Sequence, residues 1–216
     1  MHIPDGFLDL KTWVSTGIIS AVIIGGAVRK VNKAIGAEGD NEKIIPVMGV
    51  MGAFVFAAQM FNFPVAGGTS GHFMGGVLAA LLLGPLTGLL ILTTVLIVQC
   101  LIFQDGGLTA LGANIFNMGF VGSYLGYYIY KILAIFLPGP KQKMAAIFIA
   151  GWFSIVLAAA ACALELAFSG TVSLKIALPA MAGVHALIGV GEGLITVVVA
   201  GLIAKVRPDL LNLQKV

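Results

Sequence analysis

The first two residues carry nitrogen donors in an arrangement that can chelate a metal ion. His2 directly follows Met1, so the terminal amine, the His2 backbone nitrogen and the imidazole Nδ1 can close two fused chelate rings. These three nitrogens share a plane, and His72 is the obvious donor for the fourth corner of a square. A square of nitrogens selects Ni(II) or Cu(II) over Zn(II), which prefers a tetrahedron. The amine and the amide must both give up a proton, so affinity should fall in acid.

The alternative is that a histidine at the second position is accidental and mobile. Pro4, Asp5 and Gly6 form a turn signal, which favours a segment 1–11 folded back into a cavity on the outer side. His72 could equally be a core histidine, but Gly67, Gly68 and Gly71 around it indicate close backbone approach.

Other polar side chains are candidates for hydrogen bonds that support the ligands. Glu192 lies seven residues after His185, about two helical turns, so the two share a helix face. This pair could support the metal, relay protons or hold helices together. Glu165 is expected only to mark the membrane interface. The full set of candidate supporting residues is Ser70, Asn114, Asn117, His185 and Glu192, with Gln59 and Asn62 also considered.

The composition places these residues in a membrane protein. Of the 216 residues, 59% are hydrophobic and only 10% are charged, against about 25% charged in a soluble domain. So few charges cannot cover the surface of a soluble globule, and the chain is too apolar to be disordered. Cys100 and Cys162 lie in apolar runs and are interpreted as small buried hydrophobes.

The expected fold is a single all-α membrane domain, residues 1–216, with about seven transmembrane helices. The candidate segments are Thr12–Val31, Ile44–Phe61, Gly71–Leu83, Pro85–Phe103, Gly112–Leu137, Met144–Phe168 and Leu178–Ala204. The third is too short to span at full thickness and follows the Gly-rich stretch Pro64–Ser70. Non-helical backbone at membrane depth is tolerated when it is buried or lines a cavity, so we expect this stretch to line the site.

The lysines and arginines predict the orientation. With seven spans, ten of the twelve fall on one side, which puts the N-terminus outside and the C-terminus in the cytoplasm. Merging the third and fourth segments into one span would place Lys131, Lys141 and Lys143 outside. The distribution of positive charge therefore favours seven spans. The leader contains Asp5 and Asp9 and lacks a signal-peptide pattern, which predicts an exported, uncleaved terminus with Met1 retained.

Two stripes of small residues recur at spacing four and let helices approach closely. They comprise Gly17, Ala21 and Gly25 in the first segment, and Gly49, Ala53 and Ala57 in the second. Either internal packing or docking to a separate membrane protein would use them. The chain contains no phosphate-binding G-x-x-x-x-G-K-[ST] loop and no basic-aromatic surface, so neither ATP nor nucleic acid is an expected ligand.

Four motifs together resemble the CbiM/NikM family, the substrate-binding (S) subunits of nickel and cobalt energy-coupling factor transporters. They are the octet Met1–Leu8, the run Gly68–His72, the run Gly112–Gly119, and His185 with Gly191-Glu192. The resemblance extends over essentially the whole chain. It implies that Ni²⁺ or Co²⁺ is bound by the Met1 amine, the two His2 nitrogens and His72.

The resemblance also implies partners and a location. These are a transmembrane coupling protein, a pair of ATP-binding cassette ATPases, often a small accessory membrane subunit, and the lipid bilayer of a prokaryotic cytoplasmic membrane. The chain itself would be a transporter subunit rather than an enzyme, and Ala53 and Ala57 would form the docking face.

The rival interpretation is a rhomboid-like intramembrane serine protease. Gly68–Gly71 fits its G-x-S-G pattern, with Ser70 as nucleophile and His185 as base. The rhomboid histidine is usually followed by H-x-x-G, whereas Gly189 lies four positions after His185. This interpretation also leaves the N-terminal octet unexplained, so the sequence favours transport.

Overall fold

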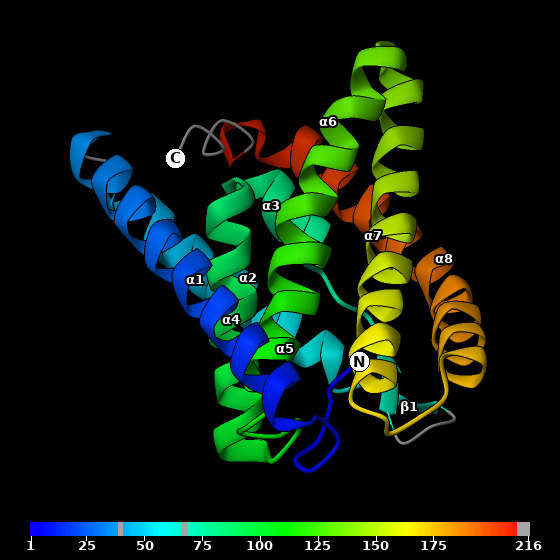
Figure 1. The fold of residues 1–216 in the computed structure, drawn as a ribbon. Helices are drawn as coiled ribbons and strands as arrows, with labels where there is room; N and C mark the ends of the chain where they lie inside the picture. The colour runs from blue at the N-terminus through cyan, green and yellow to red at the C-terminus, as the bar shows by residue number, and fades with distance from the viewer. Residues whose placement is uncertain (39–40, 66–68, 211–216) are drawn as a thin grey trace.

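The computed structural model describes residues 1–38, 41–65 and 69–210, and it is a bundle of helices with a small hairpin at one end (Figure 1). In chain order the elements are α1 (Leu10–Glu38), α2 (Asn41–Gln59), β1 (Asn62–Val65), β2 (Thr69–His72), α3 (Gly76–Leu83), α4 (Pro85–Phe103), α5 (Leu111–Asn114), η1 (Ile115–Leu125), α6 (Gly126–Phe136), α7 (Pro140–Phe168) and α8 (Leu174–Val206). The segment η1 is a π-helix that joins α5 to α6.

The helices have the length and composition of membrane spans. Among the described residues, five continuous helices are long and apolar enough to cross a bilayer: Leu10–Ile35, Pro85–Phe103, Leu111–Phe136, Lys141–Phe168 and Leu174–Val206. Ile44–Gln59 is a shorter apolar helix. The helix α3 has only eight residues, which at 1.5 Å per residue is far short of a bilayer of about 30 Å. The predicted helical membrane fold is therefore confirmed at this level.

The third predicted segment differs from the prediction in where its helix begins. Residues 69–72 form strand β2, which pairs antiparallel with β1 so that His72 lies opposite Asn62. The helix α3 starts only at Gly76, after Gly75 adopts a φ of 74°, a left-handed conformation that favours glycine. The pairing with β1 satisfies backbone groups of β2 that would otherwise lack partners. His72 consequently lies on a strand and not on a helix.

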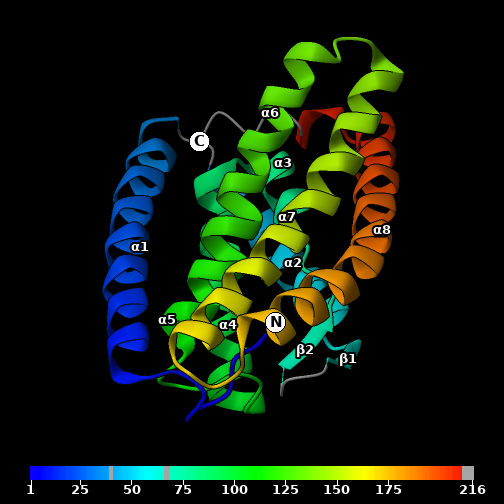
Figure 2. The same ribbon diagram turned by 45° about the vertical axis from the view of Figure 1, so that its right-hand side comes forward.

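The core forms around α3, all of whose residues are buried. Glycines let the neighbouring segments approach its backbone closely. A Cβ added at Gly88 of α4 would lie 2.9 Å from the Ala80 Cα, and one added at Gly76 would lie 3.0 Å from the Ser123 Cα of η1. The helix α1 lies to one side of this core (Figure 2).

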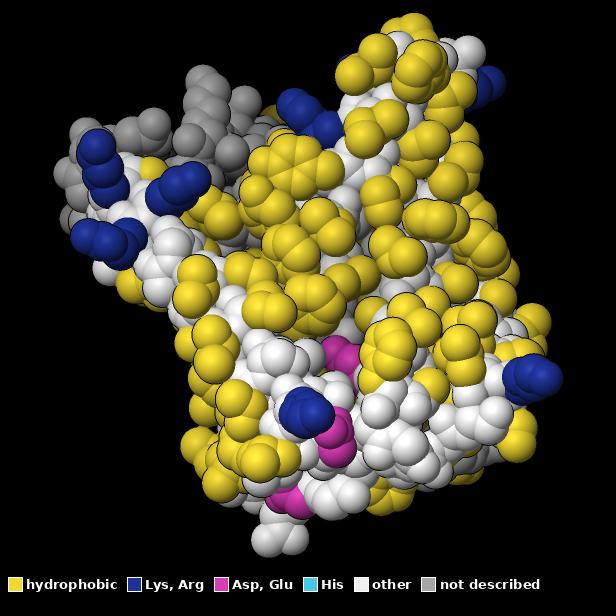
Figure 3. Space-filling model, viewed as in Figure 1, with side chains coloured by type: hydrophobic (Ala, Val, Ile, Leu, Met, Phe, Trp, Pro, Cys, Tyr) yellow, Lys and Arg dark blue, Asp and Glu magenta, His cyan; other side chains and the backbone are white. Residues whose placement is uncertain are grey.

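Hydrophobic side chains cover much of the face of the bundle that Figure 3 shows. Lysine and arginine side chains gather mainly toward the end of the molecule opposite the N-terminal segment, and the visible acidic side chains lie toward the N-terminal end. This distribution suits a protein that is surrounded by lipid along its middle.

Candidate metal centre

The N-terminal segment is folded into the bundle. Met1 and Ile3 are fully buried, and His2 is 4% exposed. The Ile3 N–H donates to Asn114 Oδ1 over 2.8 Å, and Asn114 Nδ2 donates back to the Ile3 carbonyl over 3.1 Å. The Gly107 N–H donates to the same carbonyl over 2.8 Å. A side chain at Gly107 would collide with the Asp5 backbone, so this glycine allows the segment to lie directly on the loop.

Two aspartates secure the rest of the segment. Asp5 accepts hydrogen bonds from the backbone N–H groups of Leu108 (3.0 Å) and Thr109 (2.7 Å) and from the Thr109 hydroxyl. The bonds from Thr109 lower the pKa of the Asp5 carboxyl below its usual value. Asp9 accepts from the Thr12 N–H over 3.0 Å at the start of α1, as a helix N-cap does.

His2 and His72 meet face to face at the buried end of this segment. Their ring centroids are 4.7 Å apart, with 26° between the planes. His2 Nε2 lies 3.0 Å from Gln99 Oε1, and His72 Nδ1 lies 2.7 Å from the Phe73 carbonyl. Both oxygens can only accept, so these two ring nitrogens carry the protons. Within the described part of the chain, His2 Nδ1 and His72 Nε2 make no hydrogen bond.

The surroundings keep the Met1 amine and the two imidazole rings uncharged. Burial lowers the pKa of the Met1 amine to about 5. Burial first, and then the nearby amine, lower the pKa of His2 to about 3 and that of His72 well below its usual value. All three groups are therefore neutral at pH 7, as metal ligands must be. Asp105 Oδ1 lies 3.4 Å from His2 Nδ1, but a neutral imidazole makes this contact polar rather than ionic.

Glu192 holds the loop that follows His72. Its Oε2 accepts from the Met74 N–H over 2.7 Å, and its Oε1 accepts from the Gly75 N–H over 2.9 Å. Gln59 Nε2 donates to the Met74 carbonyl over 2.9 Å from the other side. The carboxylate is 1% exposed, and these are the bonds that orient the chain between β2 and α3.

His185, which was predicted to share a helix face with Glu192, is fully buried on α8. Its Nδ1 donates to the Met181 carbonyl over 2.7 Å. Its Nε2 makes no hydrogen bond to the described residues. His185 thus repeats the pattern of the other two histidines, with one nitrogen committed to the protein and one bare.

Asn117 is fully buried on η1. Its Nδ2 donates to Glu165 Oε2 over 2.6 Å, between η1 and α7. Glu165 is only 7% exposed, near the end of α7, and the amide partner makes its burial possible. The backbone of Ser70 is part of β2, but its side chain lies outside the described residues, as do Gly67 and Gly68.

Two residues near His2 were missed in the sequence. Gln99 is fully buried on α4 and contacts the His2 ring, and Asp105 follows that helix. The signal for Gln99 was a lone amide in the otherwise apolar run Pro85–Phe103. Among the described residues, no group of three or more His, Cys, Asp or Glu side chains is arranged to bind a metal ion.

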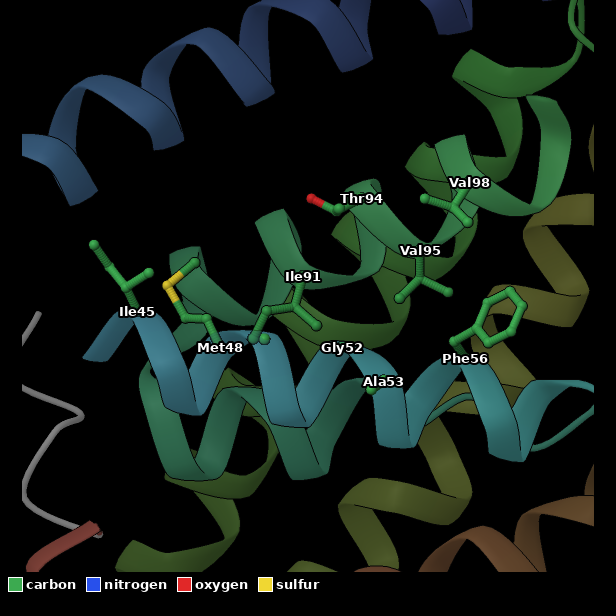
Figure 4. A pocket seen from close by; sticks show the side chains of 10 residues that line it. Ile45, Met48, Gly52, Ala53, Phe56, Ile91, Thr94, Val95 and Val98 are labelled. Atoms are coloured by element: carbon green, nitrogen blue, oxygen red, sulfur yellow. The ribbon is translucent and has the colours of Figure 1, made fainter. Parts of the chain in front are cut away.

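The two small-residue stripes have different surroundings. A Cβ at Gly112 of α5 would lie 2.5 Å from the Gly17 Cα, and the Ser20 hydroxyl donates to the Gly112 carbonyl over 2.7 Å. Gly17 therefore serves internal packing of α1. Ala53 instead lines an open apolar groove of about 470 Å³ between α2 and α4 (Figure 4), and Ala57 is exposed one turn further along. The groove is lined by Ile45, Met48, Gly49, Gly52, Ala53, Phe56, Ile91, Thr94, Val95 and Val98.

The fold and this end of the bundle define a multi-pass helical membrane protein with a buried cluster of nitrogen donors. Residues 2–210 match the CbiM family, described as the cobalt uptake substrate-specific transmembrane region, and the chain belongs to that family. The resemblance seen in the sequence motifs is thereby confirmed.

Several known proteins are similar over almost the whole chain. A putative fused nickel transport protein NikMN of Archaeoglobus fulgidus is 44% identical over 214 residues, covering 98% of this chain and 68% of the relative. A putative metal transport protein of Haloquadratum walsbyi is 42% identical, covering 99% of this chain and 94% of the relative. The crystal structure of a transition metal transporter superposes with a TM-score of 0.87 at 36% identity, covering 95% of this chain and 93% of that one.

Proposed function

We propose that the chain is the substrate-binding subunit of a transporter that takes up Ni²⁺, or Co²⁺, across a prokaryotic cytoplasmic membrane. The observation that carries the proposal is the pair of stacked, buried histidines beside a buried terminal amine. Each ring donates one N–H to the protein, and its other nitrogen has no hydrogen-bond partner among the residues that the structure describes. Metal-binding histidines characteristically have this arrangement, because the bonded nitrogen fixes the ring and its tautomer.

The proposed ligands are the Met1 amine, the backbone nitrogen and Nδ1 of His2, and Nε2 of His72. Four nitrogens in a plane suit nickel, and Co(II) accepts the same ligands with somewhat lower affinity in the Irving–Williams order. Relatives of this chain are named as nickel transport proteins in some organisms and as cobalt transport proteins in others. We therefore propose nickel as the preferred cargo and cobalt as the alternative.

The supporting residues hold the metal ligands in place without binding the metal themselves. Asn114 fixes the N-terminal segment through Ile3, and Glu192 fixes the loop after His72. His185 offers a further bare nitrogen in the same buried region. Ser70 and Asn117 complete the proposed set.

Transport would need partners, because the chain contains no phosphate-binding loop for ATP. We propose that a transmembrane coupling protein docks on α2 at Ala53 and Ala57, where the open groove supports close helix approach. A pair of ABC-type ATPases, and in some systems a small accessory membrane subunit, would complete the assembly. The N-terminus and the metal site would face outward, with most lysines and arginines in the cytoplasm.

A metal titration of the purified protein tests this function. We expect one Ni²⁺ per chain, with an absorption band typical of planar nitrogen coordination. His72→Ala should abolish that band, and Cys162→Ser, which alters a buried thiol in α7, should leave it intact. Absence of binding to the wild type would refute the function, and an unchanged band in His72→Ala would refute the ligand assignment.

A further inference from the structure

A continuous chain of buried amides joins His2 to the loop that follows His72. His2 Nε2 contacts Gln99 Oε1 at 3.0 Å, and Gln99 Nε2 donates to Gln59 Oε1 over 2.9 Å. Gln59 Nε2 then donates to the Met74 carbonyl over 2.9 Å. Both glutamines are fully buried, one on α4 and one on α2. Buried amides in apolar helices are costly unless every polar atom is satisfied, which indicates a specific role for this pair.

The direction of every bond in this chain follows from its last member. The Met74 carbonyl can only accept, so Gln59 must present its NH₂ group there and its oxygen to Gln99. Gln99 must then donate to Gln59 and turn its own oxygen toward His2. The only ring nitrogen within reach, Nε2, must therefore carry the proton. A fixed backbone carbonyl thus determines which nitrogen of His2 is left bare.

A competing group makes this control necessary. Asp105 Oδ1 lies 3.4 Å from His2 Nδ1 and would attract a proton to that nitrogen. A proton on Nδ1 would block the atom that closes the second chelate ring. The acceptor at Gln99 opposes this pull from the other side of the ring.

We propose that Gln59 and Gln99 are positioning residues that hold His2 in the Nε2–H tautomer and so keep Nδ1 open to the metal. The consequence for metal binding rests on the proposed function, whereas the tautomer is a property of the metal-free protein. The same chain ties His2 to the Met74 carbonyl, while Glu192 binds the N–H groups on the other side of that loop. The two histidine ligands are thereby set relative to each other by α2, α4 and α8.

Nitrogen NMR of the imidazoles tests the tautomer directly. The metal-free wild type, labelled with ¹⁵N-histidine in detergent micelles, should show one Nε2–H ring and two Nδ1–H rings. His2 should give the first, while His72 and His185 should give the others, since their Nδ1 atoms donate to backbone carbonyls. Single His72→Gln and His185→Gln variants assign the signals. A wild-type His2 protonated on Nδ1 would overturn the proposal, whatever the variants do.

Gln59→Leu gives the sharpest variant, because Gln59 acts on His2 only through Gln99. We expect the His2 signal to shift toward the Nδ1–H form, with the other two rings unchanged. Nickel affinity should fall about 10- to 100-fold, the usual effect of losing such a partner. Gln99→Leu should act the same way. Thr93→Val is the matched control: it removes a buried hydroxyl of α4 that donates to the Leu89 carbonyl of the same helix.

The outcomes separate this inference from the proposed function. If Gln59→Leu weakens nickel binding while His2 keeps the Nε2–H form, Gln59 is merely structural and the inference fails. If neither the tautomer nor the affinity changes, it fails as well. If the tautomer shifts as expected but the wild type binds no nickel, the positioning role stands and the proposed function falls.

Discussion

Glu192→Ala would remove both acceptors from the loop between β2 and α3. The N–H groups of Met74 and Gly75 would then be buried without partners, since the carboxylate they bind is 1% exposed. Each unsatisfied buried donor costs about 1–3 kcal/mol, so the loss should be about 2–6 kcal/mol, less whatever water or loop movement recovers. Glu192→Gln keeps one acceptor oxygen and should lose about half as much.

The loss should appear both in folding and in metal binding. The loop begins next to His72, so loosening it should lower nickel affinity about 10- to 100-fold. Thermal unfolding in detergent and calorimetric nickel titration measure the two effects. Thr196→Val is the control, because Thr196 is fully buried one turn away and its hydroxyl donates only to the Glu192 carbonyl over 2.7 Å.

A result in which Glu192→Ala binds nickel like the wild type would contradict the role assigned to this loop. Equal losses in Glu192→Ala and Thr196→Val would also contradict it, since the effect would then belong to α8 packing in general. The ordering expected is wild type and Thr196→Val together, then Glu192→Gln, then Glu192→Ala.

Three further predictions concern the terminus, the pH dependence and the docking face. Nα-acetylation of Met1 converts the proposed amine ligand into an amide in a fully buried position, so nickel titration should detect no binding while circular dichroism stays unchanged; binding that survives would exclude the amine. Nickel affinity should rise about tenfold per pH unit between about pH 6 and 7.5, because the Met1 amine, with its pKa lowered to about 5, is already neutral and binding releases only the His2 amide proton. Nickel binding should weaken more steeply as the pH falls through about 5. A hundredfold rise in affinity per pH unit near pH 7 would show that the amine is still charged there. Ala53→Trp should fill the groove between α2 and α4 and abolish nickel uptake in vesicles reconstituted with the coupling protein and ATPases, without changing nickel binding. Val22→Trp, on the exposed face of α1, is the control. Normal uptake by Ala53→Trp would place the docking face elsewhere.

The helices were predictable because membrane spans are governed by length and apolarity. Each of the seven predicted segments contains helix, although η1 is π-helical and the third helix is much shorter than its segment. The hairpin was not predicted, since Pro64 and the glycines indicated only non-helical backbone. Strand pairing depends on which backbone groups find partners, and no side-chain periodicity reports that in a four-residue strand.

The candidate ligands were visible in the sequence, whereas their connections were not. His2 and His72 could be named from a terminal chelate and a glycine-flanked histidine, and the structure brings their rings into a stack. Gln99 was overlooked because a single amide in an apolar run carries no spacing signal. Its importance depends on a path through Gln59, 40 positions earlier, to a carbonyl at Met74. Such a path exists only once α2 and α4 are packed together.

X-ray absorption at the nickel edge of the purified, nickel-loaded protein tests the central claim most directly. We expect four nitrogen scatterers around the nickel, no sulfur, and the pre-edge feature of square-planar nickel. A sulfur scatterer would indicate a ligand such as the buried Cys162. A six-coordinate shell rich in oxygen would contradict the planar site formed by the terminus and two histidines.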